Sequence, residues 1–261
     1  MIDTLANVRK EGFLTIVHVN NPPANTLSST CIENLRSIFQ ELSEDKETMA
    51  IILTGFGRFF VAGADIKEFV DAFGQREAAL KMAEAGQALC NEIEAMKKPV
   101  IAAINGPALG GGLELALGCH FRIASNKAIL GLPELKLGLL PTFGGTQRLT
   151  SITGRAKALQ LIVTSKQLNA EEAMQLGIIE MITESEELLA TAKDVAQSFI
   201  EGKSMTSVSR TIDCVMQGTK ENLEAGLKKE RELFAELFLT EDAKEGVQAF
   251  VDKRQPHFKH F

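Results

Sequence analysis

A glutamate placed just after three consecutive glycines is the feature of this sequence best suited to chemistry. Gly110, Gly111 and Gly112 precede Leu113–Leu117, a run of good helix formers, so a helix is expected to begin near Gly112. The first N–H groups of a helix have no internal partner and carry partial positive charge, which favours an anion beside them. Glu114 follows Gly111 by three residues, about one helical turn, so its carboxylate should lie near those N–H groups. The pattern indicates a base beside an oxyanion hole, a set of donors that stabilises negative charge on a substrate oxygen.

The same residues also fit a purely structural role. Three glycines can form a tight crossover between a strand and a helix, and Glu114 can stabilise the helix dipole from the first turn. The glycines are followed by neither Lys-Ser nor Lys-Thr, and their spacing differs from GxGxxG, so the segment matches neither a phosphate loop nor a dinucleotide fingerprint.

A second candidate segment is FFVAGADIKEF, residues 59–69. Small residues at Ala62, Gly63 and Ala64 leave backbone N–H groups accessible to a ligand. Asp65 is expected to cap a helix, and Lys67 could neutralise a phosphate if the turn binds one. A plain strand-turn-helix junction is the alternative.

A second glutamate lies in the apolar segment LGLPELKLGLLP, residues 130–141. Burying a carboxylate among such residues is costly unless it is paired, exposed or functional. Glu134 is therefore the second catalytic candidate, with an exposed loop as the alternative.

The composition is typical of a soluble globular protein. The chain has 261 residues, 45% of them hydrophobic, and its net charge of -6 disfavours nucleic acid as the main partner. The N-terminal residues resemble neither a signal peptide nor a transit peptide, and no apolar run approaches the roughly 20 residues of a membrane-spanning helix, so a cytoplasmic protein is expected. Scattered cysteines and histidines predict buried thiols, no disulfide and no metal site: Cys31, Cys90, Cys119, Cys214, His18, His120, His257 and His260.

Short apolar runs alternate with amphipathic ones, which is typical of an α/β chain. Strands are expected at about 13–19, 50–54, 100–104, 121–124, 128–132 and 178–182. Helices are expected after Ser28 or Ser29, after Asp65, at 76–96, after Gly112, after the loop at 141–149, at 156–164, and from a capping box at Asn169–Glu172 to Gly177.

The composition changes from about residue 186 onward. Amphipathic helices are expected at about 186–201, 204–217, 219–238 and 241–253, without strands. A boundary near Ser198 divides the chain into a core at 1–197 and a helical region at 198–261. The apolar faces of these helices are expected to pack against partner subunits.

Three motifs in order, FFVAGADIKEF, NGPALGGGLELALGC and LGLPELKLGLLPTFGGTQRL, resemble the crotonase, or enoyl-CoA hydratase/isomerase, family. The likeness runs from about Phe13 to the C-terminus. It implies a spiral of ββα units carrying a CoA thioester site, followed by helices that build a homotrimer, usually paired into a homohexamer.

The resemblance also implies roles for individual residues. It assigns the oxyanion hole to the backbone N–H groups of Ala64 and Gly111, and catalysis to Glu114 and Glu134. Substrate and CoA would contact Ala24, Ala62, Ala64, Asp65, Ile66, Lys67, Gly111 and Phe143. Coenzyme A enters as part of the substrate, and no metal or other cofactor is expected.

Having both acids favours enoyl-CoA hydration, in which two glutamates act on one water during fatty-acid β-oxidation. A Δ3,Δ2-enoyl-CoA isomerase and a methylglutaconyl-CoA-type hydratase are alternatives. The family's usual loop PGAGGTQRL reads PTFGGTQRL here, so Phe143 adds bulk near the acyl pocket and favours short to medium chains. Binding of RNA would need a basic helix, but Lys228, Lys229 and Arg231 alternate with glutamates.

Overall fold

A six-stranded sheet forms the centre of the protein in the computed structural model, which describes residues 5–218 and 223–260. The strands lie in the order β1-β2-β3-β4-β6-β9, with β1 antiparallel to β2 and the others parallel to their neighbours. They are β1 (Ala6–Glu11), β2 (Leu14–Val19), β3 (Ala50–Gly55), β4 (Val100–Ile104), β6 (Phe121–Ser125) and β9 (Met181–Thr183). A small second sheet joins β5 (Ala108–Leu109), β7 (Ile129–Gly131) and β8 (Leu168–Asn169).

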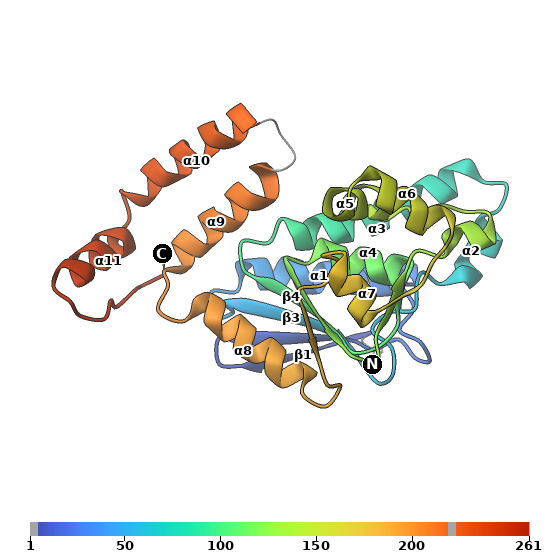
Figure 1. Ribbon diagram of the computed structural model, residues 1–261, viewed down its shortest axis with the longest axis horizontal. Helices are drawn as coiled ribbons and strands as arrows, with labels where there is room; N and C mark the ends of the chain where they lie inside the picture. The colour runs from blue at the N-terminus through green and yellow to red at the C-terminus, as the bar shows by residue number, and fades with distance from the viewer. Residues whose placement is uncertain (1–4, 219–222, 261) are drawn as a thin grey trace.

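Helices cover both faces of the large sheet (Figure 1). On one face, alternate strand residues such as Leu53 and Ala102 pack against α1 (Ser29–Glu44), α3 (Arg76–Glu94) and α4 (Gly111–Gly118). On the other face, Ile52 and Ile101 pack against α8 (Leu188–Ile200). This double covering explains why the parallel strands read as continuous apolar runs. The predicted α/β class is confirmed.

Shorter helices connect the strands on the face that carries α4. They are α2 (Ile66–Ala72), a 3-10 helix (Glu134–Leu137), α5 (Gly145–Thr153), α6 (Arg155–Val163) and α7 (Ala170–Gln175). Asp65 caps α2 as predicted, since its Oδ1 accepts the N–H of Lys67 at 3.1 Å. The predicted capping box of Asn169 and Glu172 is also confirmed.

The C-terminal helices form an arm to one side of the core, away from α5 and α6 (Figure 1). They are α9 (Met205–Gly218), α10 (Leu223–Leu237) and α11 (Glu241–Val251), as predicted apart from residues 219–222, which lie outside the described residues. Asp242 is buried, and accepts hydrogen bonds from Ser204 Oγ and from the N–H groups of Lys259 and His260. It therefore ties the end of the described chain to the start of α9.

Some local expectations differ from the structure. The strand expected at 178–182 begins only at Met181, because Ile178 donates its N–H to Ala173 O and so completes the end of α7. Cys214, expected to be buried, is partly exposed on α9, whereas the other three cysteines are buried and all four are free thiols. The division of the chain near Ser198 stays a prediction; the residue itself lies in α8. No described helix is both long and apolar enough to cross a membrane.

Candidate active site

The glycine turn before α4 brings the backbone close to a neighbouring segment. Gly110 precedes the helix with φ 52° and ψ −126°, a conformation that other residues rarely adopt. A Cβ on Gly112 would lie 2.0 Å from the carbonyl oxygen of Val61. Glycine is thus required for α4 to begin where it does, at Gly111, one residue earlier than predicted.

The two predicted oxyanion-hole amides lie on these adjoining segments. Leu27 donates its N–H to Gly63 O and accepts the N–H of Asp65, so the N–H of the intervening residue, Ala64, points to the other side. Gly111 is the first residue of α4, and its N–H therefore precedes the internal hydrogen bonds of the helix. Both Ala64 and Gly111 line one large cavity.

Glu114 lies in the first turn of α4 and is only 2% exposed. Its Oε1 accepts two backbone hydrogen bonds, from Phe143 N at 2.8 Å and Gly145 N at 2.7 Å. Burial raises the pKa of Glu114 to about 7; the Gly145 and Phe143 N–H groups oppose this, and the charge of Glu134 adds to it. A carboxyl group with such a pKa can both take up and release a proton near neutral pH.

Glu134 is the first residue of the 3-10 helix, and its side chain lies beside the glycine turn. A Cβ on Gly110 would lie 2.8 Å from Glu134 Oε1, which places this carboxylate directly over the turn. Among the described residues, no partner bonds to its buried Oε2, and burial raises the pKa of the group. An unpaired buried carboxylate oxygen is costly and points to a ligand. The alternative of an ordinary exposed loop does not fit this position.

A cavity of about 680 Å³ joins these groups. Glu114 and Glu134 line it together with Ala64 and Gly111, so the four predicted catalytic and oxyanion-hole residues all border one space. Most of the remaining wall is apolar, and it comes from α2, α3 and the segment after Glu134, including Phe69, Ala72, Ala79, Met82, Leu139 and Leu140. Such a wall suits a hydrocarbon chain.

The other predicted contact residues divide into two groups. Ala62, Ile66 and Phe143 line the cavity. Three others are absent from its wall: Ala24, whose carbonyl accepts the N–H of Ala62, Asp65, which caps α2, and Lys67, which is exposed on the first turn of α2.

Phe143 packs its ring tightly between two glycines. A Cβ on Gly86 of α3 would lie 2.1 Å from the ring, and one on Gly111 would lie 3.1 Å from it. Because Phe143 also donates its N–H to Glu114, the residue links the wall of the cavity to the carboxylate of Glu114.

Sequence reasoning missed the side chains that hold the loop around Phe143. Gln87 of α3 donates to Thr142 O at 2.9 Å, and Arg148 of α5 donates to Phe143 O at 3.0 Å. Arg148 is anchored in turn by Asn91 and Glu94 of α3. The available signal was the spacing of Gln87, Asn91 and Glu94, which places all three on one helical face.

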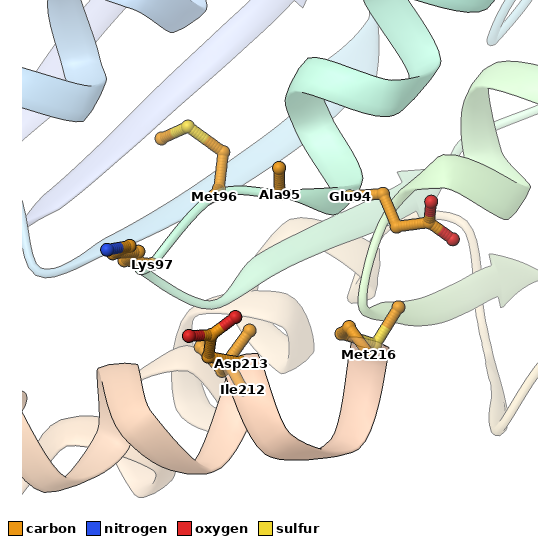
Figure 2. A pocket seen from close by; sticks show the side chains of 7 residues that line it. All are labelled: Glu94, Ala95, Met96, Lys97, Ile212, Asp213 and Met216. Atoms are coloured by element: carbon orange, nitrogen blue, oxygen red, sulfur yellow. The ribbon is translucent and has the colours of Figure 1, made fainter. Parts of the chain in front are cut away.

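A second cavity, between the end of α3 and α9, is much smaller (Figure 2). Its volume of about 30 Å³ accommodates one or two water molecules but no organic ligand. The large cavity is therefore the candidate active site.

Comparison with known proteins decides the family. A family model described as enoyl-CoA hydratase/isomerase matches residues 9–260. The chain belongs to the enoyl-CoA hydratase/isomerase family. The predicted family is thus confirmed over nearly the whole sequence.

Individual relatives agree with this family. The chain is 46% identical over 248 residues to a probable enoyl-CoA hydratase of Bacillus subtilis (strain 168), covering 95% of each protein. It is 39% identical over 250 residues to a short-chain-enoyl-CoA hydratase of Clostridium acetobutylicum, again covering 95% of each. The crystal structure of an enoyl-CoA hydratase from Bacillus anthracis superposes with a TM-score of 0.92 at 35% identity, covering 98% of this chain and 100% of that one. The predicted crotonase-like fold is confirmed.

Proposed function

We propose that this protein is an enoyl-CoA hydratase, a hydro-lyase that adds water reversibly and syn across a 2-trans-enoyl-CoA to give 3-hydroxyacyl-CoA. The observation that carries the proposal is the meeting of Glu114 and Glu134 at one cavity, beside the amides of Ala64 and Gly111. The names of the similar curated proteins support the same reaction.

The thioester carbonyl accepts hydrogen bonds from the N–H groups of Ala64 and Gly111. Addition of water at C3 moves negative charge onto the thioester oxygen, where these donors and the start of α4 stabilise it. Loss of one such donor typically costs about 10²–10³ in rate.

Glu114 and Glu134 act on one water molecule. One carboxylate takes the proton of the attacking water at C3, and the other carboxyl group delivers a proton to C2. Two features of the site support proton transfer by this pair of glutamates. The pKa of Glu114 is raised to about 7, and Oε2 of Glu134 has no protein partner among the described residues. Repulsion between the two groups keeps one of them protonated.

The acyl chain enters the apolar part of the cavity, with Phe143 limiting it to short or medium length. Coenzyme A is held as part of the substrate by the segment from Ala62 to Lys67 with Ala24, and the reaction requires no metal or further cofactor. Lys67, exposed at the start of α2, neutralises a phosphate of the CoA arm.

The biological setting in this proposal is fatty-acid β-oxidation in the cytoplasm. Arm helices α9 to α11 build a homotrimer or homohexamer. Large apolar side chains that these helices leave exposed, such as Phe234, Val247 and Phe250, support this assembly.

Activity across a panel of substrates tests the reaction. Loss of the conjugated enoyl-thioester absorbance is measured with 2-enoyl-CoA of increasing chain length, and product formation is measured with 3-enoyl-CoA. Fast hydration of short and medium 2-enoyl-CoA is expected. Conversion of 3-enoyl-CoA to 2-enoyl-CoA without hydration would instead identify the isomerase.

A further inference from the structure

The loop at residues 142–145 orients Glu114 through two peptide groups. In a trans peptide the N–H and the preceding C=O point in opposite directions, so holding one end of the peptide fixes the other. The Thr142–Phe143 peptide donates its N–H to Glu114 and accepts Gln87 Nε2 at its carbonyl, at 2.9 Å. The direction of this donor is therefore set from α3.

The second donor is fixed in the same way from α5. The Gly144–Gly145 peptide donates its N–H to Glu114, and its carbonyl accepts the N–H groups of Gln147 and Arg148 at 3.1 and 2.9 Å. Both peptides that hold Glu114 are thus clamped at their far ends.

The side chain of Arg148 holds the carbonyl between these two peptides. Its Nη1 donates to Phe143 O at 3.0 Å, while Nη2 donates to Asn91 Oδ1 at 2.7 Å and pairs with Glu94 Oε2 at 3.1 Å. A Cβ on Gly144 would lie 2.2 Å from Nη1, so the guanidinium lies directly against the loop backbone.

The ion pair that anchors this guanidinium is largely buried. The side chains of Arg148 and Glu94 are 12% and 10% exposed. Glu94 is the last residue of α3, and Figure 2 shows its carboxylate directed away from Lys97. Arg148 is absent from the wall of the large cavity, so its route to the reaction runs through the loop and Glu114.

We propose that Arg148, anchored by Glu94, is a positioning residue that fixes the loop amides orienting Glu114 for proton transfer. This inference rests on the proposed acid–base role of Glu114. Displacement of a reacting group by about 1 Å can cost about 10²-fold in rate, so a loosened loop lowers turnover even though substrate contacts are intact.

The charge of Arg148 supplies a second readout. Burial raises the pKa of Glu114, and the charge of Arg148 lowers it, so removing the guanidinium raises that pKa further. The limb of the pH–rate profile that belongs to Glu114 therefore moves to higher pH.

The experiment measures kcat, KM, the pH–rate profile and thermal stability for Arg148→Met, Arg148→Lys and Glu94→Gln. Arg148→Met is expected to lower kcat by about 10- to 100-fold with KM changed less than about threefold, and to shift the Glu114 limb upward. Lysine retains the charge but lacks the fork that reaches both Phe143 O and Glu94. Arg148→Lys should therefore bring the Glu114 limb back towards its wild-type pH, while kcat stays low.

Arg36→Met is the matched control, because the Arg36–Glu92 ion pair also joins α3 to another helix, α1, but touches neither the loop nor Glu114. It should change stability without changing kcat or the pH profile.

A folded Arg148→Met enzyme with wild-type kcat and pH profile overturns the positioning role, provided that Glu114→Gln is inactive. If Arg148→Met does not fold, kcat and the pH–rate profile of Arg148→Lys and Glu94→Gln test the positioning role instead. Wild-type values in both variants would overturn it. Full hydration by Glu114→Gln would instead overturn the proposed function, and the positioning role with it.

Discussion

Replacing Gly86 with alanine is expected to displace the ring of Phe143. The added Cβ would lie 2.1 Å from ring atom Cδ1, 2.2 Å from Cε1 and 2.4 Å from Cγ, far inside the contact distance of about 3.5–4.0 Å between carbon atoms. On its other side the ring lies against Gly111, so it cannot move away freely.

The expected cost has two parts. Overpacking in a tight site costs about 1–3 kcal/mol, while glycine to alanine inside a helix contributes about 0.5–1 kcal/mol of stability. Gly86→Ala should therefore lower the free energy of unfolding by about 0–2.5 kcal/mol. Phe143→Ala removes the obstructed ring, so in the double mutant the added methyl group of residue 86 should no longer destabilise.

Equilibrium denaturation of the two single mutants and the double mutant measures the coupling. A coupling free energy of about 1–3 kcal/mol is expected, since residues in direct contact do not behave additively. Gly246→Ala in α11 is the control for helix propensity, because a Cβ there would lie 3.3 Å from the Phe258 ring, which needs to shift by only a few tenths of an ångström. Additive effects of Gly86→Ala and Phe143→Ala would refute the placement of the ring.

Three further predictions follow from the same structure. Phe143→Ala should shift the preference among 2-enoyl-CoA substrates towards longer chains, and an unchanged profile would remove Phe143 from the acyl pocket. Because burial raises the pKa of Glu114 from 4.5 to about 7, the native state retains a proton that the unfolded state releases, so the contribution of Glu114 to stability should fall as pH rises between these values. Glu114→Gln has no such titration, so its free energy of unfolding minus that of wild type should increase by on the order of 3 kcal/mol between pH 4 and pH 8, as measured by denaturation. The same difference at both pH values would contradict the raised pKa of Glu114. Asp242→Ala should cost about 1–3 kcal/mol, because it leaves donors of Ser204, Lys259 and His260 without their acceptor, and faster proteolysis after residue 204 would report it; unchanged stability and proteolysis would contradict this role.

Local signals in the sequence located most of the helices and strands. The capping box of Asn169 and Glu172, the cap of Asp65 and the apolar runs of β3 and β4 depend on neighbouring residues and could be read directly. Strand β1 could not, because its sequence ANVRKE buries only Ala6 and is a strand by virtue of its pairing with β2. An edge strand of this kind carries little periodic signal.

The site shows the same division between local and distant information. The glycine turn and both glutamates were identifiable from residue type and motif. The donors that hold Glu114 could not be identified, since Phe143 and Gly145 lie 29 and 31 residues away in the sequence. The Arg148–Glu94 pair spans 54 residues and forms only when α5 docks on α3.

The rate of water addition by Glu134→Gln tests the two-carboxylate mechanism most directly. Glutamine keeps nearly the same shape but can neither take up nor release a proton in the reaction, so folding and binding of free CoA should be nearly unchanged. We expect kcat for hydration of a short 2-enoyl-CoA to fall by about 10²–10⁴, the usual contribution of a positioned general acid or base. The Glu114→Gln/Glu134→Gln double mutant should lose much less than the product of the two single effects, because both groups act in one step. Wild-type hydration by folded Glu134→Gln would contradict the account and leave a site that works with a single acid.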